Sequence, residues 1–306
     1  MRLVFAGTPD AAVPSLRGLA ASAHEITLVV TRPDAPRGRR RVMTPSPVAQ
    51  TAADLGIDTF TTARLDDDAT DRIGAARPDL GVVVAYGGLV REPLLSLPPH
   101  GWINLHFSLL PRWRGAAPVQ HAIIAGDAVT GAAVFGLVPA LDAGDVYAQL
   151  EHPIPPAATA GDLLDDLAVR GAVLLADVVD AIADGTASSR PQVGEPTLAP
   201  KLTLDDARVR WEEDAAAVLA RIRGVTPEPG AFTTLDGGRV KILGARPGDS
   251  ELRPAPGAVV AAGGEVLVGT GSTPVALDIV QPAGKAAMAA GDWWRGVRTA
   301  EPRVGT

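Results

Sequence analysis

The chain has 306 residues, of which 46% are hydrophobic and 21% are charged, so it can form one large core or two ordinary ones and is not disordered throughout. The absence of cysteine excludes a disulfide framework, a thiolate metal site and a cysteine nucleophile. A formal net charge of -7 argues against a protein that coats nucleic acid through a basic surface. The sequence has no apolar run of about 20 residues, so we expect no membrane span.

The first half of the chain alternates strand patterns with helical patterns. Short apolar runs predict four strands, at 3–6, 26–30, 79–85 and 102–105, and a helix at 11–21. This alternation predicts a Rossmann-like α/β domain with a mostly parallel sheet. Ligands bind such sheets at the carboxyl ends of the strands. The turn after the first strand lacks the G-x-G-x-x-G spacing, which disfavours an NAD-dependent hydride transfer.

The second half changes character. An amphipathic pattern predicts a long helix over 162–183, and a stretch rich in Pro, Gly and Ser follows with little periodicity. After a short helix at 215–223, β-prone runs separated by Gly-rich turns predict a small antiparallel, OB-like barrel. We therefore expect a catalytic domain, a linker and a C-terminal domain, over 1–189, 190–204 and 205–306.

The most informative stretch covers 101–127. Asn104 and His106 alternate with Leu105 on a predicted strand, so their side chains share one face and aim two donors at one spot. From the residues alone, a structural role and a catalytic role for His106 are equally good interpretations. Asp142, in the string Leu-Asp-Ala-Gly-Asp, is by itself typical of a turn.

Several motifs together resemble the folate-dependent formyltransferases, and most closely the branch that acts on methionyl-tRNA. The resemblance covers nearly the whole chain. Its motifs are FAGTPD at the start, RPDAPRGRRRVMTPSP from Arg32, VVAYG from Val83, NLHFSLLPRWRGAAPVQ from Asn104, LDAGD from Leu141, KLT from Lys201 and TPEPGAF from Thr226. Two departures lie in the C-terminal half, where GKAAM replaces the family's G-K-K-x-M and Phe232 replaces a common Trp.

The resemblance implies a reaction and a role for each of three residues. Formyl transfer from N10-formyltetrahydrofolate to an amine passes through a tetrahedral intermediate with an oxyanion. By the family pattern, Asn104 hydrogen-bonds the formyl oxygen, and His106 stabilises the oxyanion and shuttles the proton. Asp142 is expected to hold the imidazole and raise the pKa of His106 above about 6.5. No metal is expected.

The resemblance also implies the contacts of the co-substrate. Ser108, Leu109, Leu110 and Pro111 are expected to line the tetrahydrofolate site, with the backbone of Tyr86 and Gly87 nearby. An apolar pocket with a few polar groups suits such a ligand. The alternative is that Leu109 and Leu110 are simply core residues.

One segment is strongly positive although the chain as a whole is negative. Residues 32–41 contain five arginines and one aspartate, a local charge of +4, and Pro33, Pro36 and Gly38 predict a loop rather than a helix. A solvated charged loop is the ordinary interpretation. The resemblance instead implies contact with the acceptor stem of a tRNA, for which arginine suits phosphates and base edges. The expected tRNA contacts are Arg37, Arg39, Arg40 and Arg41.

We therefore expect an enzyme that formylates the α-amine of methionyl initiator tRNA. The alternatives are a formyltransferase that acts on a nucleotide-linked amino sugar and a non-catalytic tRNA-binding protein. Asn104, His106 and Asp142 argue against the latter, because a binding module needs none of them. The opening residues interrupt their apolar stretch with Gly, Thr, Pro and Asp, which is unlike a signal peptide, so we expect a cytoplasmic protein and a monomer.

Overall fold

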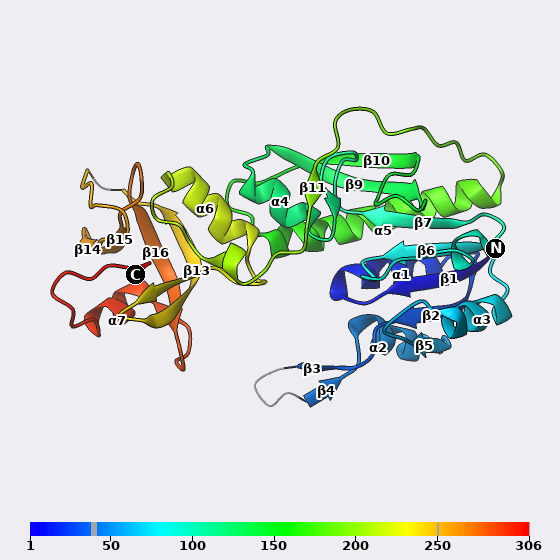
Figure 1. Ribbon diagram of the computed structural model, residues 1–306, viewed down its shortest axis with the longest axis horizontal. Helices are drawn as coiled ribbons and strands as arrows, with labels where there is room; N and C mark the ends of the chain where they lie inside the picture. Colours follow the sequence, from blue (N-terminus) through cyan, green and yellow to red (C-terminus); the bar gives the residue numbers. More distant parts are fainter. Residues whose placement is uncertain (38–41, 250, 306) are drawn as a thin grey trace. The chain divides into compact units, whose positions relative to one another are not determined.

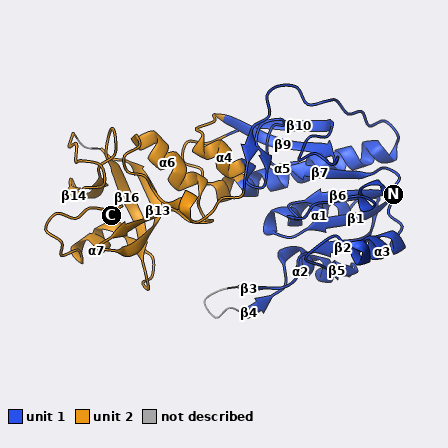
Figure 2. Cartoon of the chain, in the orientation of Figure 1, with its two compact units in different colours: residues 1–118, 129–153, 164–200 blue, residues 119–128, 154–163, 201–306 orange. Residues whose placement is uncertain are grey.

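The structure is a computed structural model that describes residues 1–37, 42–249 and 251–305. It divides into two compact units, coloured separately in Figure 2. The first contains Met1–Pro118, Val129–Pro153 and Leu164–Pro200, and the second contains Val119–Ala128, Ile154–Leu163 and Lys201–Thr306.

The first unit is built on a seven-stranded sheet, whose strands run side by side in Figure 1. Five neighbouring strands are parallel, and the last two, β9 and β10, are antiparallel. In sheet order, the strands are β10 (Val146–Pro153), β9 (Val129–Gly136), β7 (Trp102–His106), β6 (Leu80–Val84), β1 (Arg2–Gly7), β2 (Glu25–Thr31) and β5 (Thr59–Thr61). The predicted mostly parallel sheet is confirmed, and β1, β2, β6 and β7 correspond to the four predicted strands, with β6 one residue shorter at each end.

Burial explains why the parallel strands read as continuous apolar runs. All five residues of β6 are buried, because a parallel sheet is covered on both faces. Helices and 3-10 turns alternate with these strands along the chain. They are η1 (Asp10–Ala12), α1 (Val13–Ala20), α2 (Pro47–Asp54), α3 (Asp67–Ala75) and η2 (Leu94–Ser96). Of the two later helices, α4 (Pro118–Ile124) belongs to the second unit from Val119 on, and α5 (Ala160–Ala183) belongs to the first unit from Leu164 on.

Two small two-stranded pairings lie outside the main sheet. β3 (Ala35–Arg37) pairs with β4 (Val42–Thr44), so the arginine-rich segment contains a short strand where a loop alone was expected. β8 (Arg114–Gly115) pairs in parallel with β11 (Leu198–Ala199). Arg190 also exchanges backbone hydrogen bonds with Val146, at 2.8 and 2.9 Å. The stretch expected to be a linker therefore bonds to the first unit as far as residue 199.

The second unit is rich in antiparallel strands. Its main sheet has the order β12, β13, β16, β15, β14, with β17 paired to β16. Its elements are η3 (Asp205–Ala207), α6 (Ala215–Gly224), β12 (Phe232–Leu235), β13 (Gly238–Pro247), β14 (Val259–Ala262), β15 (Glu265–Val268), β16 (Val275–Pro282), β17 (Met288–Ala289) and α7 (Ala290–Arg295). This arrangement is compatible with an OB-like fold, which stays a prediction.

The last described residues bond to both edges of this sheet. At one edge, Gly305 N donates to Thr234 O of β12 at 2.9 Å. At the other, Val259 N of β14 donates to Pro302 O at 3.0 Å, and Val304 N donates to Gly257 O at 2.8 Å. The Val304 side chain is buried in the apolar core of the unit. The tail therefore pairs with strands that would otherwise be exposed edges.

No helix in the described part of the chain is long and apolar enough to cross a membrane.

The buried position of Val304 predicts a stability effect. We expect Val304→Ala to lower the free energy of unfolding by about 1–3 kcal/mol, because it removes buried apolar surface and weakens the pairing of the tail. Val193→Ala is the matched control, since Val193 is 88% exposed. Urea denaturation followed by circular dichroism measures both. Equal unfolding curves for the two variants would mean that the tail contributes nothing to the core.

Candidate active site

Two polar side chains lie on β7 next to buried strands. Asn104 pairs with Val83 of β6 and Phe135 of β9, and His106 follows two residues later on the same face. The Oδ1 atom of Asn104 is buried and has no hydrogen-bond partner among the described residues. A buried amide oxygen without a partner is costly, and such groups are often functional. Asn104 is also the only asparagine in the sequence.

His106 is held by the loop that follows its strand. The residue is 6% exposed, and its Nε2 lies 2.8 Å from the backbone oxygen of Trp113. A carbonyl only accepts, so Nε2 carries the hydrogen and the lone pair of the neutral ring is on Nδ1. The Phe135 ring meets the imidazole edge to face, with centroids 6.3 Å apart. The orientation and the tautomer of His106 are therefore both set by its neighbours.

Asp142 faces the other ring nitrogen. Its Oδ2 lies 3.9 Å from His106 Nδ1 and accepts a hydrogen bond of 2.7 Å from Gly115 N. Asp142 has a φ of 45°, in the left-handed region, within the turn that connects β9 to β10. Only glycine fits at position 144 in this turn, because a Cβ there would lie 1.8 Å from the Gly136 oxygen. From the sequence alone, Asp142 was typical of a turn. In the structure it lies in a turn, and this turn places its carboxylate beside the imidazole.

Residues far along the chain support the same loop. Trp113 N donates to Thr197 Oγ1 at 2.9 Å, and Arg114 N donates to Thr197 O at 2.8 Å. Gly115 has a φ of 128°, and a Cβ there would lie 2.6 Å from the Ala199 oxygen, so only glycine fits. The segment around β11 therefore fixes the two backbone groups that hold His106 and Asp142.

Burial decides the charge state of His106. It lowers the pKa of His106 below its ordinary value of 6.5, although Asp142 and the Trp113 carbonyl both act to raise it. Asp142 therefore acts on this pKa in the expected direction, but the expected net pKa above 6.5 is wrong. The carboxylate is too far away for a hydrogen bond, so its attraction does not compensate the lost hydration of a cationic ring. The imidazole is neutral near pH 7.

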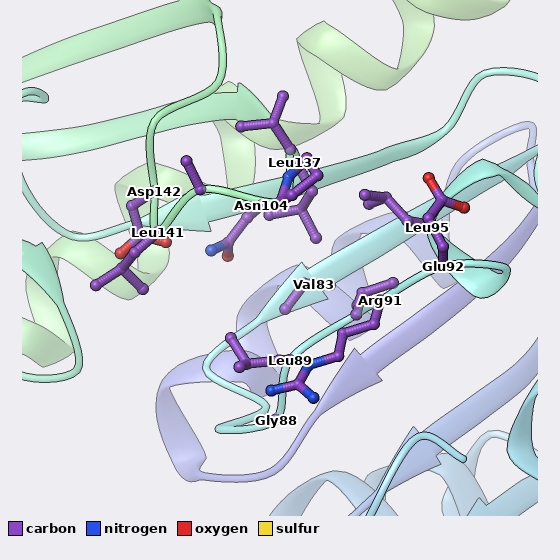
Figure 3. A pocket seen from close by; sticks show the side chains of 14 residues that line it. Val83, Gly88, Leu89, Arg91, Glu92, Leu95, Asn104, Leu137, Leu141 and Asp142 are labelled. Carbon is purple, nitrogen blue, oxygen red and sulfur yellow. The ribbon is translucent and has the colours of Figure 1, made fainter.

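A largely apolar cavity of about 340 Å³ lies next to this site. Figure 3 shows the side chains that line it. Two of the predicted site residues, Asn104 and Asp142, line it. The other lining residues come mainly from the loops after β6 and β9. They are Val83, Gly88, Leu89, Val90, Arg91, Glu92, Leu95, Leu137, Val138, Pro139, Ala140 and Leu141.

The predicted folate contacts do not line this cavity. Ser108, Leu109, Leu110, Pro111, Tyr86 and Gly87 are not among the residues that line the cavity. Ser108 is completely buried and donates from Oγ to Arg112 O at 2.6 Å. Tyr86 is also buried, and its hydroxyl donates to Thr62 O at 3.2 Å. The side chains of Ser108 and Tyr86 are thus occupied within the protein.

Sequence reasoning missed the residues that form the two walls of the cavity. Leu89 and Arg91 follow β6, and Val138 and Leu141 follow β9. The signal for the first wall was available, because it follows a predicted parallel strand at its carboxyl end. The second wall had no such signal, since β9 was not predicted as a strand.

Only one of the predicted arginine contacts falls within the described residues. Arg37 ends β3, and Arg39, Arg40 and Arg41 lie outside the described residues. Within the described ranges, no group of three His, Cys, Asp or Glu side chains is placed to hold a metal ion.

The fold is similar to that of two solved proteins. HypX from Aquifex aeolicus, solved in complex with tetrahydrofolic acid, aligns with a TM-score of 0.65 and 19% identity over 99% of this chain and 50% of that chain. This chain thus spans about half the length of HypX. An N-formyltransferase from Helicobacter canadensis, solved with folinic acid and dTDP-3-aminofucose, aligns with a TM-score of 0.68 and 15% identity over 90% and 98% of the two chains.

Relatives of higher sequence identity carry the name of one particular enzyme. The methionyl-tRNA formyltransferase of Clavibacter sepedonicus is 64% identical over 303 residues, 98% of each chain. That of Leifsonia xyli subsp. xyli is 63% identical over 296 residues, 97% of each. The family descriptions Formyl transferase and Formyl transferase, C-terminal domain match residues 1–179 and 201–298. The resemblance seen in the sequence is confirmed, and the chain belongs to the formyl transferase family.

Proposed function

We propose that the protein transfers the formyl group of N10-formyltetrahydrofolate to the α-amine of methionyl initiator tRNA, giving N-formylmethionyl-tRNA for translation initiation. The observation that carries this proposal is the meeting of an amide, an imidazole and a carboxylate, from Asn104, His106 and Asp142, beside an apolar cavity. The relatives named methionyl-tRNA formyltransferase support it over nearly the full length of the chain. The sugar-acting alternative rests only on a shared fold at 15% identity.

The lining of the cavity suits the pterin part of the co-substrate. Its walls are largely apolar, as a flat pterin ring requires, and Asn104 lines the cavity, where its amide N–H can donate to a ligand. Leu89, Val138 and Leu141 are the apolar side chains we assign to the ring. Ser108–Pro111 and Tyr86–Gly87 stay proposed contacts, through backbone groups and Leu109.

The side chains can carry out the transfer by polar chemistry alone. Bound N10-formyltetrahydrofolate supplies an activated formyl group. The Asn104 amide donates a hydrogen bond to the formyl oxygen as negative charge develops on it. Neutral His106 takes a proton from the attacking amine at Nδ1, because Nε2 already donates to Trp113. Asp142, 3.9 Å away, stabilises the imidazolium until the proton passes to the departing nitrogen.

The proposed tRNA contacts come from the arginine-rich segment and from the C-terminal domain. Arg37, Arg39, Arg40 and Arg41 are assigned to the acceptor stem. The C-terminal half has twelve basic and thirteen acidic residues over 205–306, so a basic face requires local separation of charge. Arg246 pairs with Glu265 and Asp278, which reduces its availability for phosphate.

The proposed organisation follows the sequence-based boundaries. We assign 1–189 to catalysis, 190–204 to a linker whose residues 190–199 bond back to the first unit, and 205–306 to an OB-like, tRNA-binding domain. The enzyme acts as a monomer in the cytoplasm, where charged tRNA is available.

A direct assay tests the proposed reaction. With N10-formyltetrahydrofolate, we expect formylation of initiator methionyl-tRNA, and none of elongator methionyl-tRNA or a UDP-linked amino sugar. Asn104→Leu and His106→Asn are expected to lower kcat by about 100-fold or more, because each removes a group that stabilises developing charge or moves a proton. Formylation of the sugar alone would show that the acceptor is wrong. Full activity in His106→Asn would remove the assigned proton shuttle.

The lowered pKa of His106 predicts a pH dependence of stability. The folded chain binds this proton less readily than the unfolded chain, so folding becomes less favourable as the pH falls through 6.5 toward the folded pKa. We expect the free energy of unfolding to fall between about pH 7.5 and pH 5.5, and to fall less in His106→Asn, which lacks the ring. Urea titrations at several pH values measure the free energy of unfolding of both proteins. A steeper loss in His106→Asn would indicate a raised pKa instead.

The arginine segment predicts a change that depends on the acceptor. Arg39→Ala should weaken formyl transfer to methionyl-tRNA, since it removes a contact with the acceptor stem, and should leave folate binding intact. Steady-state kinetics with the tRNA and with a small amine ester separate the two effects, and isothermal calorimetry measures the folate. An equal loss with both acceptors contradicts the assignment.

A further inference from the structure

The turn that carries Asp142 is held by a side chain from a distant part of the sequence. The amide nitrogen of Gln192 donates to Asp142 O at 2.8 Å and to Gly144 O at 2.9 Å. These two carbonyls flank the left-handed turn, in which Asp142 has a φ of 45°. Non-glycine residues adopt this conformation at a cost, and surrounding contacts must maintain it. Gln192 provides two such contacts from 50 and 48 residues away.

The orientation of the Gln192 amide follows from the chemistry of its partners. Its Oε1 accepts from Arg114 Nε at 3.1 Å and from Arg114 Nη2 at 2.6 Å. A guanidinium only donates and backbone carbonyls only accept, so one amide orientation satisfies all four hydrogen bonds. Gln192 is half-buried, whereas its neighbours Pro191 and Val193 are exposed. The side chain therefore points inward from an otherwise exposed segment.

Arg114 links this amide to the loop that holds the reacting groups. It lies between Trp113, whose carbonyl accepts from His106, and Gly115, whose N–H donates to Asp142. Gln192 thus connects the Asp142 turn on one side to the His106 loop on the other. The distance between His106 Nδ1 and Asp142 Oδ2, 3.9 Å, spans these two pieces of chain.

We propose that Gln192 is a positioning residue for the formyl transfer, which joins the Asp142 turn to the Arg112–Gly115 loop and so keeps the carboxylate facing the imidazole. The inference rests on the proposed function. Gln192 touches neither reacting group with its own side chain and acts through the backbone of Asp142. Without it, the carboxylate moves relative to the ring, and the imidazolium formed during transfer loses its counter-charge. The loss therefore falls on kcat rather than on KM.

Two substitutions separate the parts of this network. Gln192→Met keeps the length of the side chain and removes every hydrogen bond. Gln192→Glu keeps an acceptor for Arg114 and loses both donors to the turn. We expect both to lower kcat roughly 10- to 100-fold with KM for the tRNA and the folate nearly unchanged, as small misplacements of reacting groups do. Gln50→Glu is the matched control, because Gln50 donates to Pro45 O on the surface at 3.2 Å.

A measurement without substrate tests the positioning role of Gln192 separately from the proposed formyl transfer. NMR titration of the His106 ring should show a lower pKa in Gln192→Met than in the unaltered protein, because the Asp142 carboxylate that raises it is no longer held in place. This shift is expected whether or not the protein formylates tRNA. The unaltered protein in the formylation assay tests the function itself. Thermal unfolding of each variant shows that the fold is kept.

A double substitution tests the link through Arg114. If Arg114 acts through Gln192, Arg114→Met combined with Gln192→Met should lower kcat no further than Gln192→Met alone. Multiplied losses in the double variant would overturn the link. Full kcat in Gln192→Glu, or an unchanged His106 pKa in Gln192→Met, would overturn the positioning role.

Discussion

The site depends on one short loop whose backbone holds both ionisable groups. The Trp113 carbonyl accepts from His106, and two residues later the Gly115 N–H donates to Asp142. The loop can do this because Trp113 and Gly115 both have positive φ, which turns successive peptide groups in opposite directions. The relative position of imidazole and carboxylate is therefore a property of the backbone between residues 113 and 115 more than of the strand that carries His106.

Burial of the His106 ring determines how His106 and Asp142 share their roles. Because the ring is nearly inaccessible, removing water from it outweighs the attraction of a carboxylate 3.9 Å away, and the resting imidazole stays neutral. A neutral ring can accept a proton from an amine, whereas a ring that was already cationic could not. Asp142 contributes most when the ring has gained the proton, so its charge stabilises a state formed during the reaction rather than the resting enzyme.

Much of this could be predicted from the sequence, for specific reasons. Buried parallel strands have apolar runs, so β1, β2, β6 and β7 were evident, and the position of Asn104 and His106 on β7 follows from strand alternation. Gln192 and Thr197 could not be predicted, because their partners lie 50 and 84 residues away in a stretch without periodicity. The direction of the His106 pKa shift was also out of reach, since it depends on how completely neighbouring elements cover the ring.

The pairing of β8 with β11 constrains how the two halves of this chain can vary. Residues that connect domains usually tolerate insertions and deletions, because little depends on their register. Here an insertion or deletion within 191–197 would shift Thr197 and Ala199 along β8, and with them the groups that hold Trp113 and Gly115. Variation in the length of the connection is therefore confined to the few residues after Pro200.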